Sequence, residues 1–281
     1  MQIALTIAGS DSGGGAGIQA DLKTFQHFGV FGTSVITAIT AQNTIGVLAV
    51  HLVPEEIVRA QLAALAADLP AHACKTGMLA SAELVMAVAE SLDPDTPYVC
   101  DPVMVASSGD RLLDPDAERV IAERLIPGAT LVTPNLDEAA ILAGFPVADP
   151  AAMERAGRAL LELGAEAVLV KGGHLPGEVL VDLLVTPAGT RRYQHPRIAT
   201  SSTHGTGCTL SAAITAGLAR RLDGRTVGRQ VPAGLLESAV TDALDYLQRA
   251  IANAPGLGAG RGPVGEVARW QGGKVERRQG G

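Results

Sequence analysis

Short apolar runs alternate with longer stretches of helical periodicity along most of this chain. The predicted strands are apolar or β-branched and end at a glycine, a proline or a polar residue. They span residues 3–8, 33–40, 47–53, 72–75, 98–100, 131–133 and 167–170. The predicted helices span residues 16–28, 54–69, 81–92, 204–222 and 233–252. This alternation is typical of an α/β fold in which helices flank both faces of a mostly parallel central sheet.

The segment 179–195 has a different pattern. Two runs with strand character flank Pro187-Ala188-Gly189, which predicts a small antiparallel hairpin at one edge of the sheet. No long linker interrupts the chain before residue 254, so we expect a single domain over residues 1–270. Residues 271–281 are glycine-rich and charged, and we expect a disordered tail there.

Composition narrows the classes of function. The chain has 281 residues, a formal net charge of −7 and few aromatic side chains, which disfavours general nucleic-acid binding. Its three cysteines, Cys74, Cys100 and Cys208, show no CxxC spacing, which argues against a disulfide framework and a zinc site. The longest apolar run covers only residues 84–89, and no basic region precedes the first apolar stretch. We therefore expect a cytoplasmic protein without a membrane partner.

Glycines crowd the loop at residues 9–17, directly after the first predicted strand. Glycine permits positive φ and a close approach of the backbone to a ligand. The loop matches neither the Walker A pattern nor a complete dinucleotide fingerprint. The alternative is a tight turn between a strand and a helix. Asp21 lies further on in the predicted helix, where an aspartate is usually solvated.

A second loop precedes the predicted helix 204–222. Gly205, Thr206 and Gly207 would present backbone N–H groups at the helix N-terminus, an arrangement that binds anions. Cys208 lies in the first turn, where the helix dipole would lower the pKa of its thiol. The loop thus combines an anion hole with a candidate base. The alternative is a capped helix with a buried cysteine.

Polar residues also follow three predicted strands, where ligands of parallel sheets bind. Lys171 is a point charge suited to phosphate. Asn135 and Glu138 share one helical face and suit hydrated Mg²⁺, although the same spacing makes a capping box. Asp101 precedes Pro102 and is either a carboxylate on the metal side or a turn residue. Together with the anion hole, these residues predict a phosphoryl-transfer site.

Several motifs occur in the order of a known family. They are residues 8–21, 41–44, 75–79, 101–104, 133–138, 170–173 and 204–209. This set resembles the hydroxymethylpyrimidine/phosphomethylpyrimidine kinases, the thiamine branch of the ribokinase-like superfamily. The resemblance covers residues 1 to about 270, with Gln42 and Cys208 most specific to the branch. It implies a ribokinase-like three-layer sandwich.

The resemblance also implies an activity and its residues. Members transfer the γ-phosphate of ATP, with Mg²⁺, to 4-amino-5-hydroxymethyl-2-methylpyrimidine and then to its monophosphate. By position, Asp21 and Gln42 would bind the aminopyrimidine edge. The resemblance places Gly9, Met78 and Val105 around the ring. It places Lys171 and Thr206 at the ATP phosphates, and Asn135 and Glu138 with Asp101 at Mg²⁺. Gly205 to Gly207 would form the anion hole, and Cys208 would act as base. Relatives are commonly dimers, so we expect a homodimer.

Two rival functions stay open. Pyridoxal kinases of the same branch act on another planar hydroxymethyl compound, although the Gln42 amide favours an aminopyrimidine. A non-catalytic nucleotide-binding protein with the same fold would not need the complete phosphate set.

One departure from the family is Ser107, where relatives often carry a lysine. It removes a positive charge near the phosphate end and bears on the second phosphorylation.

Overall fold

The computed structural model describes residues 1–104, 115–222 and 231–265. A nine-stranded sheet forms its middle layer, in the order β3-β2-β1-β4-β5-β6-β7-β8-β9. The strands are β1 (Ile3–Asp11), β2 (Phe31–Gln42), β3 (Val47–Leu52), β4 (Ala73–Thr76), β5 (Tyr98–Cys100), β6 (Leu131–Val132), β7 (Val168–Val170), β8 (Val179–Thr186) and β9 (Gly189–Pro196). The six central strands β2, β1, β4, β5, β6 and β7 are parallel. β3 pairs antiparallel with β2 at one edge, and β8 and β9 pair antiparallel at the other.

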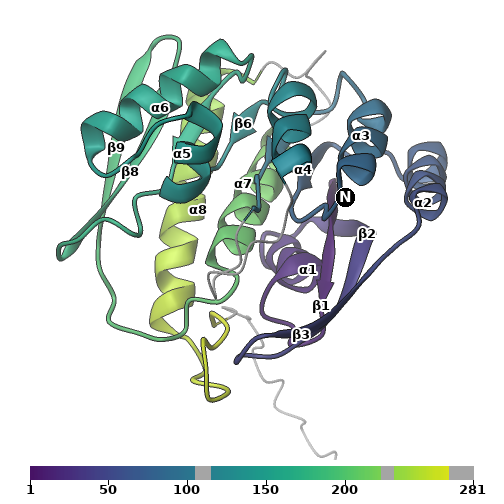
Figure 1. Ribbon diagram of the computed structural model, residues 1–281, viewed down its shortest axis with the longest axis horizontal. Coiled ribbons are helices and arrows are strands. Elements are labelled where there is room, and N and C mark those ends of the chain that lie inside the picture. Colours follow the sequence, from purple (N-terminus) through teal and green to yellow (C-terminus); the bar gives the residue numbers. More distant parts are fainter. Residues whose placement is uncertain (105–114, 223–230, 266–281) are drawn as a thin grey trace, which may run out of the picture.

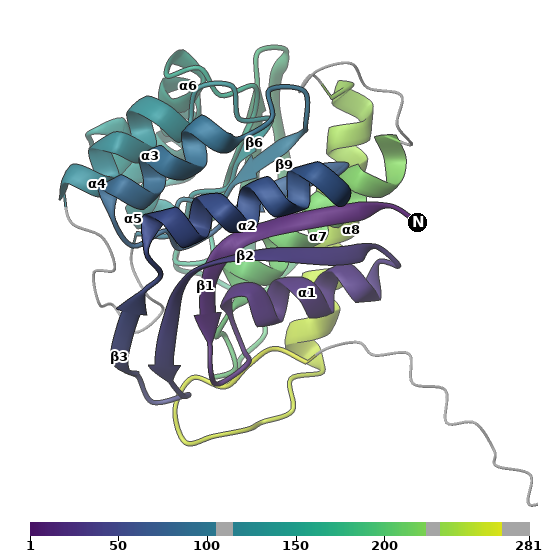
Figure 2. The same ribbon diagram turned by 90° about the vertical axis from the view of Figure 1, so that its right-hand side faces the viewer.

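Helices cover both faces of the sheet, as Figures 1 and 2 show. One face packs against α2 (Glu55–Asp68), α3 (Ala82–Ser91), α4 (Pro115–Val120), the π-helical turn η1 (Ile121–Leu125), α5 (Leu136–Ala143) and α6 (Pro150–Glu162). The other face packs against α1 (Gly17–His27), α7 (Thr206–Leu222) and α8 (Ala233–Ala252). Among the described helices, none is long and apolar enough to cross a membrane.

The parallel strands are apolar on both sides because each side chain faces a helix layer. In β5, Tyr98 and Cys100 belong to the core under α2–α6, whereas Val99 between them belongs to the core under α1, α7 and α8. Successive strand residues point to opposite faces, so a strand covered on both faces reads as a continuous apolar run. The predicted three-layer α/β architecture is confirmed.

The structure differs from the predicted elements in detail. Both ends of β2 extend beyond the predicted strand 33–40, because pairing with β1 and β3 recruits residues at each end. The edge hairpin forms from β8 and β9. The predicted helices did not include α4 or α6, and of α5 the sequence indicated only the capping box at its start. Asp149 caps α6 by accepting a hydrogen bond from the Ala152 N–H at 2.7 Å.

The parallel strands all end at the same edge of the sheet, and the predicted polar residues gather there. The pairing of β1 and β2 shifts register between Ala8 and Ser10, where β2 carries one extra residue, and Gly9 lies at this irregularity. The expected ring contact Val105, Ser107 and the expected tail 271–281 lie outside the described residues.

Candidate functional site

A cation between carboxylates marks one end of the site. Lys171, which follows β7, lies 3.1 Å from Asp101 Oδ1 and 3.9 Å from Glu138 Oε2. Asp101 also accepts hydrogen bonds from Thr133 at Oδ1 and from Ser211 at Oδ2. Burial alone would raise the pKa of Asp101, but Lys171 and Lys75 lower it. Asp101 therefore stays ionised and anchors the lysine.

Glu138 has a different electrostatic environment. It forms a capping box with Asn135: the Asn135 side chain accepts from the Glu138 N–H at 2.9 Å, and Glu138 accepts from the Asn135 N–H at 2.8 Å. Burial raises the pKa of Glu138 to about 7, against the attraction of Lys171. The capping-box alternative is thus present, and it holds the carboxyl group 3.9 Å from Lys171.

The start of α7 faces this cluster. A Cβ at Gly207 would lie 3.4 Å from Lys171 Nζ, so the first turn of the helix lies directly beside the lysine. Gly205 has a φ of +78°, and a Cβ there would lie 1.8 Å from the Gly15 carbonyl oxygen. Because only glycine permits this approach, the loops at 9–17 and 203–207 pack together. The Thr206 hydroxyl donates to the Thr203 carbonyl. Helix N-terminus and lysine thus converge as an anion site requires.

Cys208 lies in the same first turn, but the prediction that its thiol pKa is lowered is wrong. Burial raises the pKa of its thiol to about 11, although Lys75 and the N–H of Gly17 both favour the thiolate. Desolvation by the surrounding protein outweighs the helix dipole and the nearby cation. The thiol is therefore protonated at neutral pH.

This thiol can be tested by alkylation. We expect iodoacetamide to label Cys208 slowly at pH 7, with a rate that rises about tenfold per pH unit up to about pH 10. Peptide mass spectrometry would follow the labelling, and buried Cys100, whose pKa is raised to about 12, provides the internal comparison. A rate that reaches its plateau below pH 8 would contradict the raised pKa.

Gly9 and Met78 lie together beside β1, as the resemblance implied. A Cβ at Gly9 would lie 2.6 Å from Met78 Cε, so the methionine methyl group occupies the space above the glycine. The Met78 carbonyl accepts a hydrogen bond from Thr37 at 2.7 Å, which ties this loop to β2. The arrangement offers an apolar wall suited to a flat ring.

Asp21 departs from its expected place at the ligand edge. Its side chain is fully buried in α1, where Oδ1 accepts from Lys75 at 2.8 Å and Oδ2 accepts from Thr6 at 2.6 Å. Both oxygens are thus engaged beneath the site, and the structure does not open Asp21 to a ring. Lys75, also fully buried, favours the thiolate of Cys208 and the ionised form of Asp101.

Lys75 and Asp21 form a buried ion pair, so their contributions to the free energy of unfolding should be strongly coupled. We expect Lys75→Met to lower the free energy of unfolding by about 3–5 kcal/mol, because it leaves the Asp21 carboxylate buried without its cation. The double variant Lys75→Met/Asp21→Leu should recover much of that loss. Chemical denaturation would measure both variants, and a change below about 1 kcal/mol for Lys75→Met would contradict the expectation.

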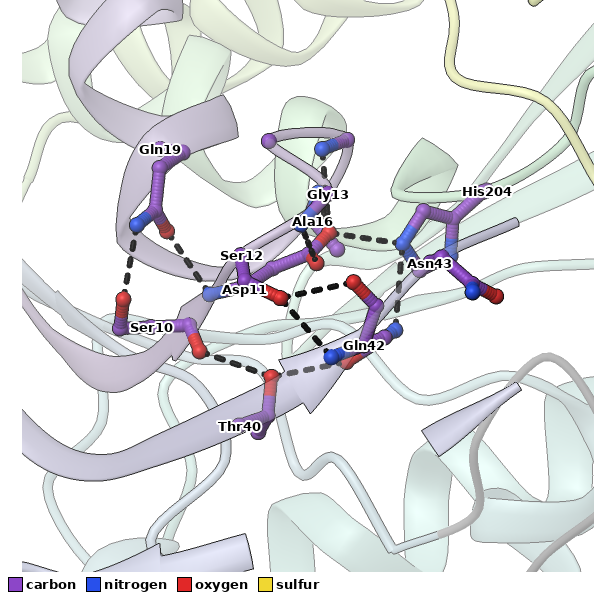
Figure 3. Close-up of polar contacts among 12 residues, drawn as sticks. Ser10, Asp11, Ser12, Gly13, Ala16, Gln19, Thr40, Gln42, Asn43 and His204 are labelled. Carbon is purple, nitrogen blue, oxygen red and sulfur yellow. Dashed lines mark hydrogen bonds and ion pairs between the residues drawn. The ribbon is translucent and has the colours of Figure 1, made fainter. Parts of the chain in front are cut away.

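A polar network surrounds Gln42 at the end of β2 (Figure 3). His204 Nε2 lies 2.9 Å from Asp11 Oδ2 and 3.3 Å from the Gln42 amide nitrogen. Neither His204 nor Asp11 was assigned a role from the sequence. Lys75 was also missed, although its place at the end of β4 matches that of Lys171 after β7.

The chain shows similarity to known kinases. The family model described as phosphomethylpyrimidine kinase matches residues 11–265. A hydroxymethylpyrimidine/phosphomethylpyrimidine kinase of Rhizobium meliloti (strain 1021) is 53% identical, over 95% of this chain and 98% of that protein. The thiamine biosynthesis bifunctional protein of Geobacter sulfurreducens is 47% identical, over 94% of this chain and 52% of that protein.

A solved structure extends the comparison to three dimensions. The pyridoxal kinase from Staphylococcus aureus in complex with ADP superimposes with a TM-score of 0.85 at 33% identity. The match covers 96% of this chain and 95% of the other.

Proposed function

Since this chain belongs to the phosphomethylpyrimidine kinase family, we propose that it phosphorylates 4-amino-5-hydroxymethyl-2-methylpyrimidine and then the monophosphate. The chain is an enzyme, an ATP-binding kinase of thiamine biosynthesis with a ribokinase-like fold. The order of the two steps and the roles of individual residues belong to the proposal.

One observation carries the proposal best. Lys171, anchored by Asp101, and the start of α7 converge at Gly207, and Cys208 follows in the same turn. Gly9 lies near the end of β1, Met78 follows β4 and Gln42 ends β2. All three therefore lie at the same edge of the sheet. A nucleotide γ-phosphate at the helix N-terminus would thus face a hydroxymethyl group carried by a flat ring.

The reaction is an in-line phosphoryl transfer. The substrate oxygen forms a bond to the γ-phosphorus, the bond from that phosphorus to the bridging oxygen breaks, and ADP departs with the electron pair. Lys171 and the N–H groups at Gly205 to Gly207 stabilise the charge on the transferring group. We propose that the Cys208 thiol first releases its own proton to water, a loss that Lys75 and the Gly17 N–H favour, and that the resulting thiolate accepts the hydroxyl proton. Because the transition state is loose, this second transfer is needed only late in the reaction.

Mg²⁺ fits beside this cluster. The donors are carboxylate and amide oxygens, which suit Mg²⁺, but both oxygens of Asp101 already accept hydrogen bonds. Within the described ranges, no three histidine, cysteine or acidic side chains are arranged to hold a metal ion. We propose that Glu138, with Asn135 and Asp101 nearby, holds Mg²⁺ through water together with the nucleotide phosphates. Bound Mg²⁺ would neutralise phosphate charge.

Turnover tests the function directly. ATP-to-ADP conversion would be measured with Mg²⁺ on the hydroxymethylpyrimidine, its monophosphate and pyridoxal. We expect turnover on the first two compounds. Absence of turnover on all three would favour a nucleotide-binding protein without catalysis and would overturn the proposal.

Pyridoxal phosphorylation is a second candidate function. The fold likeness to the Staphylococcus aureus pyridoxal kinase, over nearly the whole of both chains, supports it. Turnover on pyridoxal alone would assign the chain to vitamin B6 salvage and would leave the phosphate site unchanged. Turnover on the pyrimidine alone would exclude this candidate.

We also propose a cytoplasmic homodimer. Exposed apolar side chains gather at the edge strand β3 and its turn, namely Ile45, Leu48, Val50 and Leu52. An uncovered apolar edge is a common site of association. Light scattering at micromolar concentration should give the mass of two chains, and Leu48→Glu should shift the protein to monomers. A wild-type monomer would contradict this proposal.

A further inference from the structure

Asp11 organises the glycine loop after β1. Its Oδ1 accepts from the Gly13 N–H at 2.8 Å, and its Oδ2 accepts from the N–H groups of Gly15 and Ala16 at 3.0 and 2.8 Å. Burial alone would raise the pKa of Asp11, but the hydrogen bonds from His204 and from these N–H groups lower it. The Asp11 carboxylate is therefore ionised and acts only as an acceptor.

His204 is fixed by three neighbours. Its Nε2 lies 2.9 Å from Asp11 Oδ2, so this nitrogen carries the hydrogen and donates it to the carboxylate. Its main-chain N–H donates to the Gly262 carbonyl, which belongs to the segment that follows α8. A Cβ at Gly15 would lie 2.7 Å from His204 Cδ2, so the ring rests on the glycine loop. The imidazole thus has one position and one tautomer at Nε2.

The hydrogen-bond donors and acceptors around the Gln42 amide then decide how it is oriented. One end of the amide faces His204 Nε2 at 3.3 Å, and the other faces Thr40 Oγ1 at 3.2 Å. The Thr40 hydroxyl has a single hydrogen, which it donates to the Ser10 carbonyl at 2.9 Å. A half-turn of the amide exchanges its oxygen and nitrogen at nearly the same positions.

Only one of the two orientations gives each of these hydrogens an acceptor. With the amide oxygen towards His204, the Nε2–H is shared between Asp11 and Gln42, and the amide NH₂ donates to Thr40 Oγ1. With the nitrogen towards His204, two donors would face each other. In the favoured orientation, Gln42 keeps one free N–H and one free lone pair for a ligand. Its backbone is fixed as well, because Ser12 Oγ bonds both its N–H and its carbonyl.

We propose that His204, held by Asp11, is a specificity-determining positioning residue that fixes the donor and acceptor order of the Gln42 amide towards the substrate ring. The proposal rests on the proposed function and on the role that the family resemblance implies for Gln42, which is to bind the aminopyrimidine edge. That edge carries an amino donor beside a ring-nitrogen acceptor, so it matches a fixed amide in one order only. Pyridoxal lacks this pair, because an aldehyde stands beside its hydroxymethyl group where the pyrimidine carries the amino group.

Steady-state kinetics on the full chain test the proposal. The substrates are the hydroxymethylpyrimidine and its analogue without the 4-amino group. The variants are His204→Leu, His204→Gln, which places an N–H donor where Nε2 was, and Gln42→Met. We expect His204→Leu to raise KM for the pyrimidine about tenfold with kcat within about threefold, and His204→Gln to restore most of the affinity. For the analogue, His204→Leu should raise KM by less than about twofold.

The double variant separates positioning from a general structural role. If His204 acts through Gln42, then His204→Leu/Gln42→Met should bind the pyrimidine no more weakly than Gln42→Met alone. Multiplying effects, or an equal loss on both compounds, would overturn the proposal. Where turnover is too slow, calorimetric dissociation constants supply the same comparison.

Two further variants keep the test decisive. Thr40→Val removes the partner at the other end of the amide and should weaken pyrimidine binding in the same direction, even if His204→Leu does not fold. Exposed His51 on β3 provides the matched control, and His51→Leu should leave both kinetic constants unchanged. If Gln42→Met leaves KM unchanged, the role of Gln42 in the proposed function fails. If Gln42→Met raises KM but His204→Leu does not, the positioning role of His204 fails while the proposed function stands.

Discussion

Replacing Lys171 by methionine is expected to lower kcat by about two to three orders of magnitude. The ammonium group lies at the start of α7, where the transferring phosphate would lie, and a preorganised donor of this kind typically contributes about 10²–10³ in rate. The variant also leaves Asp101 and Glu138 buried without their shared cation. We therefore expect a lower melting temperature as well as slower turnover.

Two comparisons isolate the cause. Lys171→Arg keeps the charge but changes its shape, so it should retain more stability than Lys171→Met while recovering only part of kcat. Arg158→Met removes an exposed cation from an ion pair on α6 and should leave kcat unchanged. A Lys171→Met enzyme with kcat within threefold of the parent would remove Lys171 from the phosphate site.

Replacing Cys208 by alanine is expected to lower kcat by about 10²–10⁴, with KM for the pyrimidine changed less than about threefold. A positioned proton acceptor typically contributes a factor of this size. Cys208→Ser should show a smaller loss, because serine preserves the orientation of the substrate hydroxyl but is a poorer proton acceptor. Turnover under saturating ATP and Mg²⁺ would measure both variants.

The matched control is Cys74→Ala in β4. Cys74 is buried in the core under α2–α6, so its loss should reduce stability without changing kcat. If Cys208→Ala keeps nearly full kcat, Cys208 has no role as a base. The reaction would then rely on Lys171 and the helix N-terminus alone, which a loose transition state permits.

The cluster of Lys171 with Asp101, Glu138 and the start of α7 was largely predictable from the sequence. Lys171, Asn135 and Asp101 each follow a buried parallel strand, and parallel strands bring their carboxyl ends to one edge. Glycines at 205 and 207 before an alanine-rich helix indicated the helix N-terminus. These features depend on local pattern and on one topological rule, so a single sequence carries them.

The sequence by itself thus determined the layered α/β fold, the sheet edge at which polar residues gather and several of the residues that gather there. Only the tertiary structure decided the protonation of Cys208, the burial of Asp21 and the pairing of Asp11 with His204. These depend on desolvation and on contacts between segments far apart in the chain. Asp11 and His204 are separated by 193 positions, and Lys75 meets Asp21 across 54. Hydrophobic periodicity carries no information about such contacts, because they arise only when the helices and loops pack around the finished sheet.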